Sequence, residues 1–416
     1  MAIIRPFKAL RPRKDLVLKV QSPPYDVVST EEARELAKDN PFSFLHITRP
    51  EIDLPSGIDL YDERVYLKAK ENLERFIKDG VLFKDEKPML YLYVQKMGDR
   101  VQHGIVGVFS CEEYDRGIIK KHENTRIEKE IDRTKHIEYT NAQNGPVFLT
   151  YKARKNLRDI VKDFVNSTTP EYDFEVDGVR HTFYLMDDDK LIKKIVDIFG
   201  SIDYLYIADG HHRSAAAVRV WKKRMEENPN HTGEEPYNFF LAVAFPHDEL
   251  FIMDYNRVVK DLNGLSKEDF IKKVGEKFEI EEKSKRGNPY RPEKRHTFGM
   301  YLDGKWYKLT AKPEIVNEND PVKRLDVAIL QDNLLDPILG IKNPRKDKRI
   351  EFVGGIRGLS VLEEKADKTG GVAFSMYPTS IEELMAVADA GLVMPPKSTW
   401  FEPKLRSGLF VHKLDE

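Results

Sequence analysis

The residues with the clearest chemical potential form a ten-residue run, Ala208 to Ala217, that reads Ala-Asp-Gly-His-His-Arg-Ser-Ala-Ala-Ala. A strand-like run at 202–207 precedes it and a helix-compatible run at 214–225 follows it. Free backbone N–H groups at a helix start, with the Arg213 guanidinium beside them, are typical of a phosphate site. Gly210 lets the backbone approach a ligand closely. Asp209 next to that anion is a candidate base or metal ligand.

Two imidazoles stand in the same run. His211 and His212 can donate hydrogen bonds to phosphate oxygens, and either can carry charge near neutral pH. In the alternative interpretation the imidazoles cap a helix and Arg213 pairs with a surface carboxylate. The Asp-Gly prefix and the strand-to-helix setting favour the functional interpretation.

A second polar segment spans 121–136. Its basic side chains could bind phosphate: Lys121, Arg126, Arg133 and Lys135. Its carboxylates, Glu123 and Asp132, could hold Mg²⁺ or act as bases. The segment has little apolar periodicity and does not resemble a core helix, although a solvated helix with salt bridges is the alternative.

Two shorter motifs add candidates. Lys397, Ser398 and Thr399 follow two prolines and could present an ammonium and two hydroxyls to a phosphate, although the glycine-rich prefix of a P-loop is absent. The alternative is a tail packed by neighbouring aromatic residues. Pro23-Pro24 forms a rigid turn that aims Tyr25 and Asp26, and simple turn chemistry explains it equally well.

Composition limits the class of protein. The net charge is −2 from 68 basic and 70 acidic residues, which does not favour a nucleic-acid partner. The single cysteine excludes an internal disulfide framework and fits a reducing compartment. No run approaches the roughly 20 apolar residues of a membrane span, and no signal peptide is recognisable. We therefore expect a cytoplasmic protein with no membrane partner. The chain has no Cys pair and no zinc-type histidine spacing, so Mg²⁺ held mainly through phosphate oxygens is the expected ion.

Hydrophobic patterning and turn signals predict the elements. Expected helices span 29–39, 62–79, 157–165, 188–199, 323–335 and 380–389. Expected strands span 89–95, 102–110, 146–151, 178–186, 238–245, 250–253, 298–302, 305–310 and 372–376. We expect 250–253 to partner 238–245, and the charged stretch 279–293 to be a boundary or an exposed loop. Helices and strands mix without a regular βαβ repeat, which indicates an α+β class.

The motifs also carry a resemblance to known families. Gly210-His211-His212-Arg213-x-x-Ala216 resembles the phosphate-binding turn of the ParB/sulfiredoxin superfamily, and its Asp-Gly-His start resembles the free-serine kinases on that fold. Over its length the chain is similar to a prokaryotic family whose members look like pyrophosphate-dependent L-serine kinases. That similarity is carried by Pro23-Pro24-Tyr25-Asp26-Val27, His122-Glu123-Asn124-Thr125, Asp132-Arg133, Ala208 to Arg213 and Pro396-Lys397-Ser398-Thr399.

The resemblance implies a fold and a division of the chain. It implies a ParB/sulfiredoxin-like mixed core with additional N- and C-terminal α/β elements. The catalytic core would occupy 1–265, and a C-terminal α/β region at 266–416 would help to complete the active site. His211 stands where sulfiredoxins carry cysteine, which excludes thiol-based repair, and no ParB-type DNA-binding helix-turn-helix follows the turn.

The resemblance also implies an activity and its residues. The expected reaction is phosphoryl transfer from pyrophosphate, or from ADP or ATP, to the hydroxyl of free L-serine. Asp209 is the preferred base, with Glu123 second and His211 assisting. Phosphate contacts fall to Gly210, His212, Arg213, Lys121, Arg126, Arg133, Lys397, Ser398 and Thr399. Serine contacts fall to Tyr25, Asp26 and His122, and a Mg²⁺ contact to Asp132. A nucleotide-binding switch and a phosphohydrolase that uses the same anion site remain the alternatives.

Overall fold

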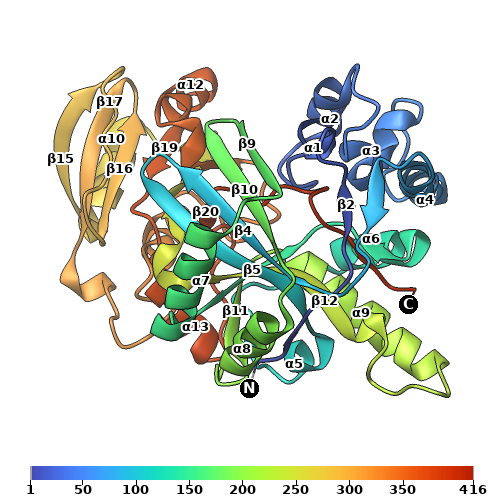
Figure 1. Ribbon diagram of the computed structural model, residues 1–416. Helices are drawn as coiled ribbons and strands as arrows, with labels where there is room; N and C mark the ends of the chain where they lie inside the picture. The colour runs from blue at the N-terminus through green and yellow to red at the C-terminus, as the bar shows by residue number, and fades with distance from the viewer. Residues whose placement is uncertain (1, 416) are drawn as a thin grey trace. The chain divides into compact units, whose positions relative to one another are not determined.

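The structure is a computed structural model that describes residues 2–415. The chain divides into two compact units, Met1–Leu250 with Pro403–Glu416, and Phe251–Glu402 (Figure 1). This division differs from the expected boundary after residue 265. The strand β14 (Tyr255–Val259) pairs with two strands of the second unit, which moves the boundary before it. The last residues of the chain return to the first unit.

A nine-stranded mixed sheet organises the first unit. The strand order is β6-β11-β8-β12-β5-β4-β10-β9, and β1 also pairs with β5. In that order the bounds are Ile119–Lys120, Leu205–Asp209, Val147–Tyr151, Phe239–Pro246, Arg100–Ser110, Leu90–Met97, Val179–Met186 and Tyr172–Val176, with β1 at Ile4–Arg5. The pairs β6–β11 and β8–β12 are parallel and the others are antiparallel. The mixed helix and strand content agrees with the expected class, whereas the ParB/sulfiredoxin-like assignment stays a prediction.

The helices of the first unit include those expected at 29–39, 62–79, 157–165 and 188–199. They are α1 (Val17–Val20), α2 (Thr30–Ala37), α3 (Leu45–Thr48), α4 (Glu63–Lys78), α5 (Cys111–Asp115), α6 (Ile127–Thr140), α7 (Lys155–Ser167), α8 (Asp189–Phe199) and α9 (His211–Glu227). Ser29 and Glu32 form a reciprocal capping box at α2, and Asp188 caps α8. The hairpin β4–β5 turns at Gly98, which has a φ of 59°. Short sheets pair β2 (Leu10–Pro12) with β3 (Leu82–Lys84), and β7 (Ala142–Gln143) with β21 (His412–Lys413).

The second unit is built on a six-stranded antiparallel sheet of order β15-β17-β16-β19-β14-β18. The strands not yet given are β15 (Phe278–Lys285), β16 (Thr297–Leu302), β17 (Lys305–Ala311), β18 (Ile350–Gly354) and β19 (Val372–Ser375). Its helices are α10 (Lys267–Lys277), α11 (Asp326–Leu330), α12 (Ser360–Thr369) and α13 (Ile381–Asp389). The strands expected at 298–302 and 305–310 form the hairpin β16–β17, and Asp303 and Gly304 between them both have positive φ, as a two-residue hairpin requires.

Three sequence expectations are wrong in detail. The stretch 279–293 is not all loop, because its first residues belong to strand β15, which pairs with β17. The strand β13 (Phe251–Met253) pairs with β20 (Trp400–Glu402) rather than with β12. The 121–136 segment runs into α6, whose buried face carries Asp132, His136 and Ile137, because polar side chains there have partners inside the unit. Within residues 2–415 no helix has both the length and the apolar character needed to cross a bilayer.

A buried ion pair joins the N-terminal strand β2 to the main sheet. The Arg11 Nε atom lies 2.8 Å from Asp85 Oδ1, and the Tyr91 hydroxyl donates to Asp85 Oδ2 over 2.7 Å. Arg11 and Asp85 are both buried. Arg11 also contacts Glu171 Oε1 at 2.9 Å, so removal of Asp85 would leave the guanidinium one carboxylate partner and would leave its Nε donor and the Tyr91 hydroxyl without their acceptor.

We therefore expect Asp85→Ala to lower the free energy of unfolding by about 1–3 kcal/mol, the cost of leaving buried donors without an acceptor. Urea unfolding followed by circular dichroism measures the change. Asp15→Ala is the matched control, because the Arg13–Asp15 pair is exposed and such pairs contribute about 0–1 kcal/mol. Equal small effects of the two substitutions would contradict the role given to the buried pair.

Candidate active site

The predicted junction is present, and α9 begins earlier than expected. Strand β11 ends at Asp209, and α9 starts at His211 directly after Gly210. Gly210 has a φ of 93°, a left-handed conformation that side chains rarely adopt. A Cβ atom at this position would lie 3.1 Å from Arg213 Cζ. The glycine is therefore required twice, for the sharp turn and for the space that the guanidinium occupies.

The Arg213 guanidinium is mostly buried but is not neutralised by a close carboxylate. One terminal nitrogen donates to the Pro146 carbonyl oxygen. The other lies 3.8 Å from Asp26 Oδ2 and 4.0 Å from Asp209 Oδ1, beyond hydrogen-bond range. Its Nε atom is buried and has no hydrogen-bond partner within residues 2–415. A buried cation with unused donors is suited to bind an anionic ligand.

Asp209 is held ionised by a lysine that the sequence did not single out. The Lys404 Nζ atom lies 3.1 Å from Asp209 Oδ2. Burial raises the pKa of Asp209, but the Lys404 ammonium and the Arg213 guanidinium outweigh burial and bring this pKa well below its usual range. The carboxylate is consequently charged at neutral pH, and its basicity depends on where Lys404 lies.

His122 and His211 form a buried pair beside this carboxylate. Their rings meet edge to face with centroids 4.5 Å apart. Burial lowers the pKa of each ring to about 3, so both are neutral at pH 7. His122 Nδ1 and His211 Nε2 are buried and make no hydrogen bond to any part of the chain that the structure describes. The pair therefore supplies neutral donors or acceptors rather than positive charge.

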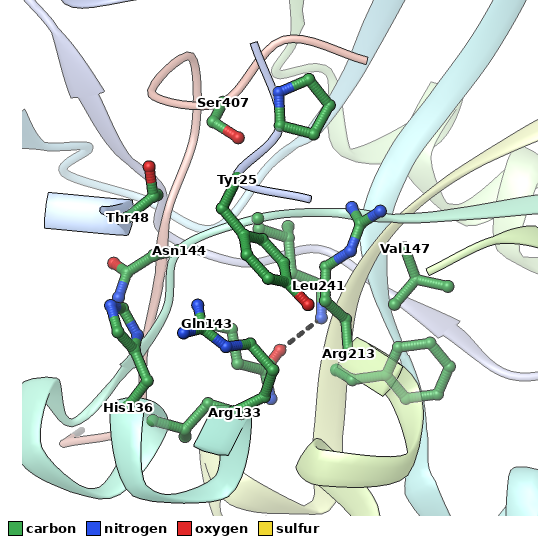
Figure 2. A pocket seen from close by; sticks show the side chains of 14 residues that line it. Tyr25, Thr48, Arg133, His136, Gln143, Asn144, Val147, Arg213, Leu241 and Ser407 are labelled. Carbon is green, nitrogen blue, oxygen red and sulfur yellow. Dashed lines mark hydrogen bonds between the residues drawn. The ribbon is translucent and has the colours of Figure 1, made fainter. Parts of the chain in front are cut away.

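Arg133 and Tyr25 form the opposite wall of the site. The guanidinium stacks on the Tyr25 ring, with Cζ 4.1 Å from the ring centroid (Figure 2). Asp132 accepts from Arg133 Nε over 2.9 Å and from the Tyr66 hydroxyl over 3.0 Å. Both carboxylate oxygens of Asp132 are thus engaged, which makes this residue the partner of Arg133. The Mg²⁺ contact predicted for Asp132 would require one of these bonds to open.

A cavity opens between the two arginines, and Figure 2 shows their side chains on its two sides. Its lining comes from six separate parts of the first unit: Pro24, Tyr25, Thr48, Arg133, His136, Ile137, Gln143, Asn144, Gly145, Val147, Arg213, Phe240, Leu241 and Ser407. Gln143 bridges the cavity floor to β12, since its Oε1 atom accepts from the Leu241 N–H over 2.5 Å. Sequence analysis missed Gln143, Asn144, Ser407 and Lys404, because no local pattern marks them.

The charges that line the site balance. Arg133, Arg213 and Lys404 supply three cations, and Asp26, Asp132 and Asp209 supply three carboxylates. Among the described residues no three His, Cys, Asp or Glu side chains converge to form a metal cage. Mg²⁺ commonly binds through one or two carboxylates and substrate phosphates, and such a site needs no cage. Asp26 fits that role best, because its carboxylate is partly exposed and makes no close ion pair.

The remaining predicted residues separate into two groups. In the first unit, His212 Nε2 accepts the Arg126 backbone N–H over 3.1 Å, which ties the 121–126 segment to α9. Lys121 and Glu123 lie close enough to act electrostatically on His211 and His212, respectively.

Lys397, Ser398 and Thr399 belong to the second unit. The Ser398 hydroxyl donates to the Pro395 carbonyl over 2.6 Å, and Lys397 Nζ lies 5.7 Å from the Tyr255 ring centroid. Their predicted phosphate contacts stay predictions. The C-terminal segment that does contact Asp209 comes after them, at Lys404.

Comparison with known protein families gives one assignment. A model described as "Protein of unknown function (DUF1015)" matches residues 4–328. The chain belongs to the DUF1015 family. The match includes the Asp209–Arg213 turn, the 121–136 segment and the Tyr25 turn, and it stops before Lys404. Comparison with curated proteins gives no significant match.

Solved structures show only distant likenesses. A free serine kinase in complex with AMP is 14% identical, with a TM-score of 0.32 over 76% of this chain and 88% of that chain. A conserved hypothetical protein from Pyrococcus furiosus is 14% identical, with a TM-score of 0.31 over 72% and 92%. SbnI with a C-terminal truncation, from Staphylococcus aureus, is 10% identical, with a TM-score of 0.37 over 72% and 84%. At these TM-scores the likenesses bear on neither the detailed fold nor the function.

We expect Gly210→Ala to weaken the binding of pyrophosphate in the presence of Mg²⁺ at least tenfold, because the new methyl group displaces the Arg213 guanidinium. Titration calorimetry measures the affinity. Gly117→Ala is the control: Gly117 also has a positive φ, of 74°, but a Cβ there meets nothing within 4 Å. Both variants should lose roughly 1 kcal/mol of stability from backbone strain. Equal pyrophosphate affinity in the two variants would contradict the spatial argument.

The neutral imidazoles also predict a pH dependence. Since folding lowers the pKa of His122 from about 6.5 to about 3, the unfolded chain binds a proton first as the pH falls. Stability is therefore lost between pH 6.5 and pH 3, by roughly 2 kcal/mol for this imidazole at pH 5. Urea unfolding at pH 7 and pH 5 should show a correspondingly smaller loss in His122→Gln than in the wild type. The same loss in both proteins would show that the buried ring is protonated in the folded state.

Proposed function

We propose that this protein transfers a phosphoryl group from pyrophosphate, or from ADP or ATP, to the hydroxyl of free L-serine, forming O-phosphoserine. The observation that carries the proposal is the Arg213 guanidinium, buried at the start of α9 with unused donors and placed beside the ionised Asp209. An anion site next to a carboxylate base suits transfer to an alcohol better than it suits storage of an anion.

The reaction forms one bond and breaks one. With pyrophosphate as donor, the serine Oγ atom attacks one phosphorus atom, the bridging P–O bond breaks, and orthophosphate leaves with that bond's electrons. The serine hydroxyl proton passes to Asp209. Little other covalent chemistry is required, since phosphoryl transfer depends mainly on positioning and charge neutralisation.

The position of Lys404 controls how readily the Asp209 carboxylate accepts a proton. In the structure the ammonium lies 3.1 Å from the carboxylate and keeps its pKa low. A phosphate donor bound at Arg213 offers Lys404 a second anionic partner. As Lys404 turns toward the phosphate oxygens, the pKa of Asp209 rises, and the carboxylate becomes a better proton acceptor when the donor is bound. Glu123 is the second candidate base.

The balance of charges indicates that the phosphate donor binds together with a metal ion. Three cations and three carboxylates leave no surplus positive charge for a polyanion. Mg²⁺ on the donor would supply the missing charge, with Asp26 as the carboxylate that contacts the ion. His122 and His211, as neutral rings, bind phosphate oxygens by hydrogen bonds only. The donor identity and the metal dependence are parts of this proposal.

A single experiment separates the candidate functions. The protein is incubated with Mg²⁺, L-serine and, in turn, pyrophosphate, ADP, ATP or CTP, and phosphorus is followed by NMR. We expect phosphoserine with pyrophosphate, and loss of the product when EDTA removes the metal. Orthophosphate alone would indicate a phosphohydrolase instead. Tight binding without turnover would indicate a nucleotide-dependent switch.

The base is tested by Asp209→Asn, which keeps the shape of the side chain but cannot accept the proton. We expect kcat to fall by about 10²–10⁴. Asp203→Asn, at an exposed position in the same part of the chain, should leave the rate unchanged. Near-full activity of a folded Asp209→Asn protein would remove Asp209 from the mechanism.

A further inference from the structure

The cavity between the arginines contains an unsatisfied acceptor. Asn144 is 6% exposed, and its Oδ1 atom is buried without a donor in the part of the chain that the structure describes. A buried acceptor without a donor is unfavourable, so this atom is suited to bind a donor from a ligand. Asn144 lines the same cavity as Arg133 and Arg213 (Figure 2).

Neighbouring hydrogen bonds determine the orientation of the Asn144 amide. The Thr140 hydroxyl donates its only proton to a carbonyl, with the His136 carbonyl at 2.7 Å the nearer acceptor. Its oxygen can therefore only accept from Asn144, and the Asn144 nitrogen lies 3.0 Å away. The amide nitrogen must point at Thr140 and the oxygen must be the unpaired atom. Thr140 is itself buried, so this arrangement does not depend on solvent.

The same cavity also has an unpaired hydrogen-bond donor and a second cation on its walls. Arg213 Nε is a buried donor without a partner among residues 2–415. The Arg133 guanidinium adds a second cation, stacked on Tyr25. Because Arg213 binds the phosphate donor in the proposed function, the acceptor meets Arg133 and Asn144, and it needs an anionic group for the first and a hydrogen-bond donor for the second. A free amino acid has this combination in its carboxylate and its ammonium.

We propose that Asn144 Oδ1 accepts a hydrogen bond from the α-ammonium of the acceptor amino acid, while the Arg133 guanidinium binds its carboxylate and leaves Arg213 for the phosphate donor. This proposal rests on the proposed function, because it assigns the amino-acid acceptor to a specific part of the same site. Asn144 then selects free amino acids over hydroxy acids of the same size.

The test measures binding without the phosphate donor, so it does not depend on catalysis. Titration calorimetry is performed with L-serine, with 3-hydroxypropanoate, which lacks the ammonium, and with ethanolamine, which lacks the carboxylate. The wild-type protein should bind L-serine at least tenfold more tightly than either partial ligand. L-threonine, L-homoserine and L-alanine extend the series to other zwitterions.

Two substitutions at position 144 give opposite expectations. Asn144→Leu removes the acceptor and should weaken L-serine at least tenfold while 3-hydroxypropanoate keeps its affinity. Asn144→Asp keeps an acceptor and adds negative charge, so it should bind ethanolamine more tightly and 3-hydroxypropanoate more weakly. Asn166→Leu, at an exposed position of α7, is the control and should change nothing. In Asn144→Asp the affinities for ethanolamine and 3-hydroxypropanoate should change in opposite directions, whereas a loss of folding would lower both.

The outcomes separate this inference from the proposed function. If phosphoserine forms but Asn144→Leu binds L-serine as the wild type does, the inference fails and the kinase stands. A second outcome is that no phosphoserine forms, but another amino acid of the series binds the wild type and binds Asn144→Leu more weakly. In that case the inference about Asn144 holds and the proposed serine kinase activity is wrong. If the wild type binds no zwitterion in the series, the inference is overturned. An equal loss of L-serine and 3-hydroxypropanoate in Asn144→Leu also overturns it.

Discussion

The site depends on the position of one guanidinium. Arg213 lies over Gly210, whose left-handed backbone and missing side chain leave the space that the guanidinium fills. From this position it reaches the Pro146 carbonyl and comes within about 4 Å of Asp26 and Asp209 without bonding either. A cation fixed by backbone contacts rather than by a carboxylate keeps donors for a ligand. The start of α9, the Tyr25 turn and the strand β8 are all arranged around it.

A second consequence of the fold is electrostatic. Three cations and three carboxylates share a small volume, and the two nearby imidazoles are neutral because they are buried. Such a site has little net attraction for a free polyanion, which distinguishes it from a simple basic patch. In the reaction that we propose, Lys404 would move from Asp209, which it contacts at 3.1 Å, to the incoming anion, and that movement would change the basicity of the carboxylate.

Local patterns in the sequence account for several elements of both units. The capping box at Ser29, the cap at Asp188 and the hairpin turns at Gly98 and Asp303 depend on neighbouring residues, so short-range chemistry determines them. The 121–136 segment was predicted less well. Its polar side chains give no apolar periodicity, yet Asp132 and His136 are buried in α6 because Tyr66 and the Ile47 carbonyl satisfy them from elsewhere in the chain.

By itself the sequence determined the Asp209–Arg213 turn, since a strand, a glycine and a helix start must follow one another there, and it identified Tyr25, His122 and Arg133 as candidates. Only the tertiary structure decided what meets that turn. Lys404, from the C-terminal segment, lies 195 positions away along the chain and contacts Asp209. Asn144 is chemically ordinary in sequence and becomes distinctive only because Thr140 orients its amide and leaves one oxygen unpaired in the cavity. Contacts across such separations depend on packing of the whole unit, which no local spacing records.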